Sequence, residues 1–411
     1  MHRVVVTGMG VISPVGNSTE SFFQNLVNGV SGIGPITRFD TTDYKVKLAG
    51  EVKDFDPEAF GIDKGLARRC DTFTLYALAA AEQAMRQSGL SGAVAPERFG
   101  VYVGSGIGGM QTFVNETEKL LTRGPSRVSP FFVPMMISNI AAGNIAIRYG
   151  AQGPCLPVVT ACATSSHTIG EAFHAIQHGY ADAILAGGAE ATILPLAVAG
   201  FTNLKALSEE TDPEKASLPF DARRKGFVLG EGAGILALEE YEHAKARGAH
   251  IHAEIVGYGN TCDAYHITAP HPQAVGGAQA LRLAMQEAGE PHGALYINAH
   301  GTGTPMNDKL ETLAIKNALG EARAREALIS STKSMTGHML GATGAVEAIA
   351  CVGALTEGII PPTIHYAEAD PECDLDYTPN QAVSAQVRWA LSTNLGFGGH
   401  NAALAFKAYE D

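Results

Sequence analysis

The sequence predicts an α/β fold, because strand-like apolar runs alternate with helical patterns along the chain. Residues 100–104 and 183–187 are predicted to be buried strands. Residues 72–88 and 277–288 repeat apolar side chains at helical spacing, and a glycine follows each segment, as is common after a helix C-terminus. The 47 glycines cluster at turns and at the ends of apolar runs, which suits a protein of many packed layers.

Length and composition favour a compact protein with a large core. A chain of 411 residues is long enough for two domains or one fused pair. Hydrophobic residues make up 45% of it and charged residues 17%, which excludes the disordered class. The formal net charge of −13 argues against a general nucleic-acid surface, so no nucleic-acid partner is expected.

The cysteines and the N-terminus predict a reducing location. The six cysteines form no CxxC pair, and a chain this large needs no disulfide staples, so we expect them to be reduced and mostly buried. We find no pattern of a signal peptide, a transit peptide or a membrane span. The cytoplasm is therefore the expected location, with no membrane partner.

A faint internal duplication runs through the chain. Residues 4–10 resemble residues 254–259, and residues 101–106 are matched in placement by residues 295–301. Short glycine-rich strand ends recur by chance, so this similarity is weak evidence by itself. It suggests two related halves.

We place the boundary between the halves near residue 250, after the helical stretch 239–248. The predicted units are therefore residues 1–250 and 251–411. No Ser/Pro-rich linker separates them, so we expect them to be packed together.

Cys162 is the most informative residue. An apolar run meets small residues there and a helical pattern begins, so the thiol is predicted at or near a helix N-terminus. Unpaired backbone N–H groups and the helix dipole favour a thiolate at that position. Most free cysteines are small buried hydrophobes. The small neighbours on both sides of Cys162 instead leave room for a substrate.

Two histidines have distinctive settings. His300 ends the strand-like run 295–299, and loops at strand C-termini commonly carry catalytic groups in α/β folds. Its neighbours Thr302 and Thr304 offer hydroxyl groups. His338 follows Gly337 and precedes a helix of small residues. A thiol and two imidazoles suggest nucleophilic acyl chemistry.

A charged pair is expected beside His338. Lys333 precedes it by five residues, and a buried lysine needs a partner. Glu347 on the following helix is the candidate partner.

Two other interpretations are weaker. Residues 104–109 follow a strand with the spacing of a dinucleotide-binding loop, but no acidic residue ends a strand about 20 residues later. Cys162, His300 and His338 lack the tight local spacing of common zinc sites, so no metal is expected.

Taken together, these segments resemble the β-ketoacyl-[acyl-carrier-protein] synthases, specifically the synthase II type of fatty acid elongation. The similarity spans nearly the whole chain, and its motifs are residues 4–11, the Cys162 segment, 219–222, 226–232, 300–304 with Asp308 and Glu311, 333–338 and 394–399. The resemblance implies a thiolase-like α/β fold of two similar βαβαβαββ halves in a five-layered α-β-α-β-α arrangement, assembled as a homodimer. That fold would explain the duplication.

The resemblance also implies the chemistry. Cys162 would take an acyl group from acyl carrier protein, and malonyl carrier protein would lose CO₂ and attack the acyl-enzyme to give a 3-oxoacyl product. Backbone N–H groups of Cys162 and Phe397 would hold the first oxyanion. Phe397 matches a mobile gate between the acyl pocket and the cysteine.

The histidines have implied roles as well. His300 and His338 would hold the malonyl thioester carbonyl and stabilise the enolate, at least one of them donating through Nε2. Lys333, with Glu347, would support them electrostatically.

Further positions match family contacts. Pocket and pantetheine contacts are implied for Ile107, Phe201, Thr268, Thr302 and Thr304. The surface that receives the acidic carrier is implied for Lys64, Arg68, Arg69 and Lys205. No cofactor is expected, because phosphopantetheine arrives on the carrier protein.

The chain departs from the family pattern at two positions outside the catalytic set. Lys225 stands where aspartate is usual, and His400 stands where threonine is common.

Two alternative functions stay open. A polyketide ketosynthase would share the Cys-His-His chemistry, and a non-catalytic acyl-carrier-protein binding module would use the same surface. The intact Cys162, His300, His338 and Lys333 argue against the second.

Overall fold

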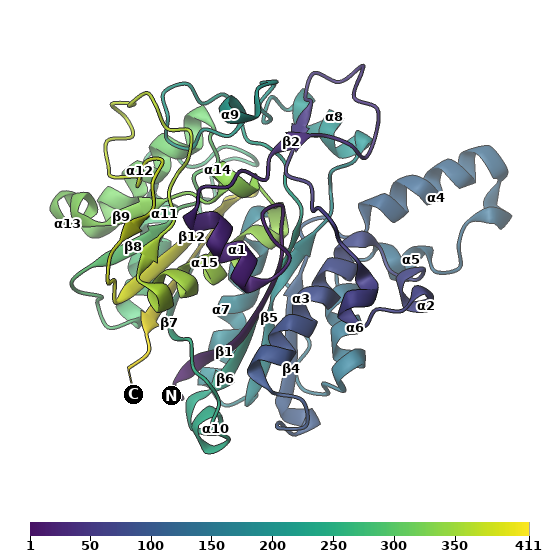
Figure 1. Cartoon of the computed structure of the whole chain (residues 1–411), viewed down its shortest axis with the longest axis horizontal. Helices are drawn as coiled ribbons and strands as arrows, with labels where there is room; N and C mark the ends of the chain where they lie inside the picture. Colours follow the sequence, from purple (N-terminus) through teal and green to yellow (C-terminus); the bar gives the residue numbers. More distant parts are fainter. Residues whose placement is uncertain (411) are drawn as a thin grey trace.

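The chain folds into two halves with similar successions of elements, as the computed structural model of residues 1–410 shows (Figure 1). The first half contains β1 (Val4–Ile12), α3 (Thr72–Ser88), β4 (Phe99–Gly104), α7 (Thr164–Gln177), β5 (Ala183–Glu190) and β6 (Gly232–Glu240). The second contains β7 (Ala253–Cys262), α11 (Val275–Glu287), β8 (Leu295–Asn298), α12 (Pro305–Leu319), β9 (Leu328–Ser330), α15 (Thr343–Glu357), β12 (Trp389–Gly396) and β13 (His400–Ala408).

The remaining helices and strands are added to this frame. They are α1 (Thr19–Val27), β2 (Gly34–Pro35), β3 (Leu48–Ala49), α2 (Lys64–Ala67), α4 (Met110–Arg123), α5 (Phe132–Met136), α6 (Ile140–Tyr149), α8 (Pro195–Asn203), α9 (Pro213–Ala216), α10 (Tyr241–Ala246), α13 (Glu321–Glu326), α14 (Lys333–Thr336), β10 (Ile359–Ile360) and β11 (Val383–Ser384).

The main strands form one mixed sheet in the order β4-β5-β6-β1-β7-β13-β12-β8-β9. The two halves join where β1 and β7 pair antiparallel, with Val4 opposite Ile255 and Val6 opposite Ala253. The two segments predicted to be related by duplication are therefore neighbours at the centre. β4–β5, β12–β8 and β8–β9 are parallel pairs.

Two helices lie between the halves. α7 packs on β4, β5 and β6 and also on β7 and β13, while α15 packs on β12 and β13 and also on β5 and β6. α3 covers the outer face of the first half, and α11 with α12 covers that of the second (Figure 1). The predicted thiolase-like layering is confirmed.

The first half lacks a regular third strand. Where β9 pairs with β8, the corresponding segment of the first half makes a single parallel bridge, Val101 to Cys155. Pro154 and Pro157 flank this bridge, and proline has no N–H to extend a ladder. The predicted βαβαβαββ order is thus complete only in the second half.

Close packing explains the duplicated glycines. A Cβ added at Gly10 of β1 would lie 1.9 Å from the carbonyl oxygen of Ala80 in α3. A Cβ added at Gly259 of β7 would lie 1.8 Å from that of Ala280 in α11. Each glycine lets a helix approach its strand closely, in the same way in both halves.

Most predicted elements have nearly the observed bounds. α3 has the predicted bounds, and Gly89 follows it at φ 64°. α11 begins two residues earlier than predicted, because Ala274, which no local pattern distinguishes as a cap, precedes it at φ 52°. β5 continues to Glu190, because Gly188 to Glu190 still pair with β6.

Residues 340–357 are the one stretch of residues 1–410 that is long and apolar enough to cross a membrane. In the fold, 89% of this stretch is buried inside the protein. Its apolar surface is therefore covered by the protein itself, as in a central core helix.

Candidate active site

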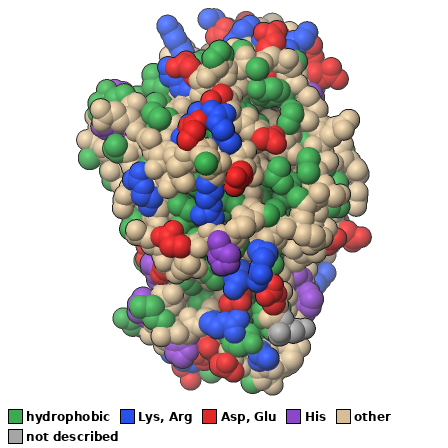
Figure 2. All heavy atoms as spheres, turned by 90° about the vertical axis from the view of Figure 1, so that its left-hand side faces the viewer, with side chains coloured by type: hydrophobic (Ala, Val, Ile, Leu, Met, Phe, Trp, Pro, Cys, Tyr) green, Lys and Arg blue, Asp and Glu red, His purple; other side chains and the backbone are tan. Residues whose placement is uncertain are grey.

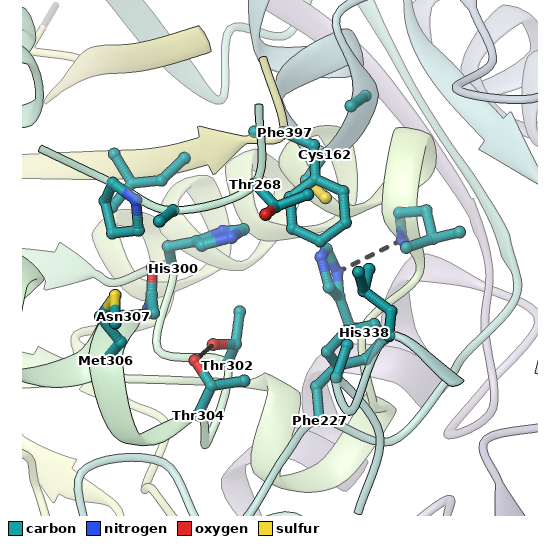
Figure 3. Close-up of a pocket in the computed structure, with 18 of the residues that line it drawn as sticks. Cys162, Phe227, Thr268, His300, Thr302, Thr304, Met306, Asn307, His338 and Phe397 are labelled. Atoms are coloured by element: carbon teal, nitrogen blue, oxygen red, sulfur yellow. Dashed lines mark hydrogen bonds between the residues drawn. The ribbon is translucent and has the colours of Figure 1, made fainter. Parts of the chain in front are cut away.

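Cys162, His300 and His338 line one cavity of about 530 Å³ (Figure 3). The cysteine comes from the turn before α7, His300 from the end of β8, and His338 from the segment between α14 and α15. Residues separated by more than a hundred positions therefore face each other. The rings of His300 and His338 are 5.2 Å apart between centroids and nearly perpendicular.

Cys162 lies in a 3-10 turn, residues 161–163, directly before α7, so its predicted place at a helix N-terminus is confirmed. The preceding residue, Ala161, adopts φ 51°, which turns the chain sharply at the thiol. The side chain is only 8% exposed. Burial raises the pKa of Cys162 to about 12, although Lys333 and the backbone N–H groups of Phe397 and Cys162 act in the opposite direction.

The expected preference for the thiolate is therefore outweighed in the free protein. Helix-end N–H groups do favour negative charge on Cys162, but removing the thiol from water costs more. The free protein holds Cys162 as a thiol at neutral pH.

His300 is held by its backbone and by its ring. Its N–H donates to Glu311 Oε1 at 2.6 Å, and Asn394 Nδ2 donates to its ring Nδ1 at 3.3 Å. Burial, followed by the charge of Lys333 and the ring of His338, keeps the pKa of His300 well below its ordinary value. The imidazole is neutral.

His338 is held in a comparable way. Its backbone N–H donates to the carbonyl of Val228 at 2.7 Å, and its ring Nδ1 accepts from the backbone N–H of Leu340 at 3.3 Å. Because Nδ1 accepts, the ring hydrogen lies on Nε2. Burial and the charge of Lys333 hold the pKa of His338 well below its ordinary value.

The predicted partners Lys333 and Glu347 are in contact. Lys333 Nζ donates to Glu347 Oε1 at 2.5 Å, and both side chains are buried. Asn394 Nδ2 donates to the other carboxylate oxygen at 2.8 Å. Burial raises the pKa of Glu347 to about 7, while the Lys333 charge opposes that rise.

The other predicted pocket residues share this cavity (Figure 3). Its lining includes Ile107, Phe201, Thr268, Thr302, Thr304 and Phe397. Thr302 and Thr304 are hydrogen-bonded to each other at 3.0 Å across the cavity from Phe397.

The predicted basic residues form two groups within one chain. Lys64, Arg68 and Arg69 lie on or just after α2, whereas Lys205 follows α8 and lines the cavity. Figure 1 draws α2 and α8 well apart. Lys64 is paired with Glu58 at 3.4 Å.

The comparisons with known proteins agree with this geometry. Residues 1–244 match the beta-ketoacyl synthase N-terminal domain, and residues 252–367 match the corresponding C-terminal domain. The chain belongs to the beta-ketoacyl synthase family. The predicted family and the predicted condensing acyltransferase activity in fatty acyl elongation are confirmed.

Similar proteins cover nearly the whole chain. A 3-oxoacyl-[acyl-carrier-protein] synthase 2 of Staphylococcus aureus is 53% identical over 410 residues, spanning 99% of both chains. One from Synechocystis is 52% identical over 411 residues, spanning 99% of this chain and 98% of the relative.

Two solved ketosynthase structures share the fold, each covering 100% of both chains. The ishigamide ketosynthase/chain length factor has a TM-score of 0.92 at 39% identity. A type II polyketide ketosynthase in complex with its acyl carrier protein has a TM-score of 0.90 at 35% identity.

Glu190 is a functional residue of this synthase that no sequence motif predicted. At the end of β5, its carboxylate accepts hydrogen bonds from Ser105 Oγ and Gly106 N, both at 2.9 Å, and from Gly341 N at 3.0 Å. It thereby joins the loops of the two halves beside Cys162. The glycine-rich loop after β4, which superficially matches a dinucleotide site, therefore offers its N–H groups to Glu190. Nothing local in the sequence links residues 105, 190 and 341.

Other lining residues were missed because they carry no reactive group. Phe227 packs its ring 5.1 Å from that of His338, and Met306 and Asn307 extend the wall beyond Thr304 (Figure 3). In the sequence, only the position of these residues next to the family motifs indicates that they line the active site.

Within residues 1–410, no cluster of three or more His, Cys, Asp or Glu side chains is arranged to hold a metal ion. The face that carries α12 and α13 mixes basic and acidic side chains (Figure 2). Pairs on it include Arg325 with Asp374 and Lys309 with Glu372. This face therefore carries no continuous patch of one charge sign.

Proposed function

We propose that Cys162, His300 and His338 perform the decarboxylative condensation of an acyl group with malonyl-[acyl-carrier-protein], lengthening the chain by two carbons. The observation that carries this proposal is the convergence of one thiol and two neutral imidazoles on a single cavity.

The first half-reaction loads the enzyme. The Cys162 sulfur attacks the acyl thioester carbonyl, its S–H proton goes to the departing pantetheine thiol, and an acyl–cysteine thioester forms. The backbone N–H groups of Cys162 and Phe397 act on the sulfur, which supports their role as donors to the oxyanion beside it. The nearby Lys333 charge lowers the cost of negative charge on sulfur.

The second half-reaction forms the carbon–carbon bond. The malonyl thioester carbonyl accepts hydrogen bonds from the imidazoles, the bond to the carboxylate breaks and CO₂ leaves. The enolate carbon then attacks the acyl carbonyl, and the Cys162 sulfur departs as a thiolate that takes a proton from water to restore the thiol. Neutral imidazoles suit this role, because His338 carries its hydrogen on Nε2 and can donate it in a hydrogen bond to the developing enolate oxygen.

Substrate contacts follow the cavity. Ile107 and Phe201 would contact the acyl chain, and Thr268, Thr302 and Thr304 would contact the pantetheine arm. Phe397, in a Gly-Phe-Gly-Gly turn, would act as the gate beside the thiol. Glu347 would hold Lys333 in place.

The partners are acyl carrier protein and a second copy of the chain. Lys64, Arg68, Arg69 and Lys205 would receive the acidic carrier, and phosphopantetheine would enter past Lys205. A homodimer is supported by the projecting α4–α5 arm (Figure 1), which exposes the apolar side chains Phe113, Leu120, Leu121, Phe131 and Val133. We retain the predicted cytoplasmic location and the division at residue 250, just before β7.

The runner-up is a polyketide ketosynthase. The solved type II polyketide ketosynthase, at 35% identity, favours it, whereas the 3-oxoacyl-[acyl-carrier-protein] synthase 2 relative is 53% identical. The two functions differ in the acyl donor and not in the chemistry.

The test is a two-step mass measurement. Acyl carrier proteins of several chain lengths should acylate the wild type but not Cys162→Ala, as intact-protein mass spectrometry would show. Malonyl carrier protein should then release a 3-oxoacyl product. No acyl-enzyme with any donor would overturn the proposal, and turnover only with polyketide intermediates would favour the runner-up.

A further inference from the structure

Asn394, on β12, is the buried side chain at which the groups behind the cavity meet. Its Nδ2 lies 2.8 Å from Glu347 Oε2 and 3.3 Å from His300 Nδ1. Its Oδ1 accepts from the hydroxyl of Ser166 on α7. The side chain has no exposed surface.

The orientation of the Asn394 amide follows from these partners. The NH₂ group faces a carboxylate oxygen of Glu347, which only accepts, and the oxygen faces the Ser166 hydroxyl. Reversing the amide would place its oxygen against the Glu347 carboxylate. Gly344 leaves the necessary room, since a Cβ there would lie 2.7 Å from Asn394 Oδ1 and 2.1 Å from Ser166 Oγ.

This orientation has a consequence for His300. The amide NH₂ can only donate, so His300 Nδ1 must accept. The neutral ring therefore keeps its single hydrogen on Nε2. Leu340 N–H imposes the same tautomer on His338 through its Nδ1.

We propose that Asn394 is a positioning residue that holds His300 as its Nε2–H tautomer, so that His300 donates to the malonyl thioester carbonyl. The inference rests on the proposed function for the identity of the acceptor. The Asn394 side chain would fix the tautomer of His300, as the backbone N–H of Leu340 fixes that of His338. Both imidazoles then present hydrogens to one developing oxyanion.

Asn394→Asp is the decisive variant, because its size is nearly unchanged. A carboxylate only accepts, so it would take a hydrogen from His300 Nδ1 and leave Nε2 as an acceptor. The malonyl carbonyl would then face a lone pair. Ser166→Ala is the matched control, since it alters the same hydrogen-bond group without touching either imidazole.

The experiment separates the half-reactions. Acylation of Cys162 by acyl carrier protein is followed by intact mass, and single-turnover condensation is followed after adding malonyl carrier protein. We expect Asn394→Asp to leave acylation within about twofold and to slow condensation by about 10²–10³-fold, the usual cost of one oxyanion donor. Ser166→Ala should change both rates by less than about tenfold. Equal losses in both steps would overturn the inference.

A spectroscopic readout keeps the test independent of turnover and of the variant's folding. In ¹⁵N-histidine-labelled wild type, long-range ¹H–¹⁵N spectra, assigned with His300→Gln, should show His300 with its hydrogen on Nε2. Asn394→Asp should move that hydrogen to Nδ1. An Nδ1–H tautomer in the wild type would overturn the inference. Failure of wild-type acylation would instead overturn the proposed function and leave this readout intact.

Discussion

The central helices α7 and α15 begin in the same way but carry different chemistry. Each is entered through a 3-10 turn, residues 161–163 before α7 and 340–342 before α15. Each turn starts from a non-glycine residue at positive φ, Ala161 at 51° and Leu340 at 45°. The second residue of the turn is Cys162 in the first half and Gly341 in the second.

The loops after β4 and β8, which face these turns, also carry different residues in the two halves. Ser105 follows β4 and is bonded to Glu190, whereas His300 follows β8 and is bonded to Glu311. A buried carboxylate anchors the loop in both halves. The first half thus presents a nucleophile among small residues, and the second presents the polar groups that act on the second substrate. Duplicated backbone geometry allows the two roles to face each other across one cavity.

Substitution in the buried Lys333–Glu347 ion pair of the second half should have the largest effect on stability. Lys333→Ala leaves the Glu347 carboxylate buried without its cation, which typically costs about 3–5 kcal/mol in the free energy of unfolding. Urea denaturation should measure this loss. Lys64→Ala, which breaks an exposed pair with Glu58, should change stability by less than about 1 kcal/mol. Similar losses for the two variants would contradict the prediction.

The nucleophile of the first half should react as a buried thiol. Since burial raises the pKa of Cys162 to about 12, its thiolate fraction should rise about tenfold per pH unit below that value. Alkylation by iodoacetamide, followed by peptide mass spectrometry, should therefore accelerate by about a thousandfold from pH 7 to pH 10. A plateau below pH 9 would show that the helix N-terminus outweighs burial.

The second half's turn should not tolerate even a methyl group. A Cβ at Gly341 would lie 2.4 Å from Gly106 N and 2.8 Å from Glu190 Oε2, so Gly341→Ala should force apart the two halves' loops. We expect a loss of about 1–3 kcal/mol in the free energy of unfolding. Gly200→Ala is the control, because a Cβ there meets no atom within 4 Å in the middle of α8. That substitution should be neutral or slightly stabilising.

The sequence predicted the layers and the reactive residues because both leave local signals. Helical spacing followed by glycine located α3, and small residues around Cys162 marked the turn before α7. Contacts between segments that are distant in the sequence left no local signal. The Glu190 bridge depends on three loops that approach only after folding, and the role of Asn394 depends on an amide orientation fixed by Ser166 and Glu347. The raised pKa of Cys162 likewise reflects burial, which neighbours in sequence do not reveal.

Burial favours the uncharged form of the reactive side chains in both halves. The smallest expected effect is therefore the pH dependence that these side chains give to condensation. Burial holds Cys162 as a thiol and keeps the pKa values of His300 and His338 well below the ordinary value of 6.5. A lowered pKa means that the neutral ring persists as pH falls. Protonation of His300 and His338 should therefore change condensation from pre-acylated enzyme by less than about twofold between pH 8 and pH 6. A larger change in this range would report on Glu347, whose pKa is raised to about 7.

The same property is visible without turnover. Imidazole ¹⁵N shifts of His300 and His338 should stay constant over this range, whereas His174, whose pKa is raised by the hydrogen bond to Glu287, should protonate at a higher pH than either of them. A midpoint near 6.5 for either cavity histidine would mean that water reaches the second half of the site. The two halves would then differ in solvation as well as in chemistry, and a permanently neutral pair of donors could not explain the condensation step.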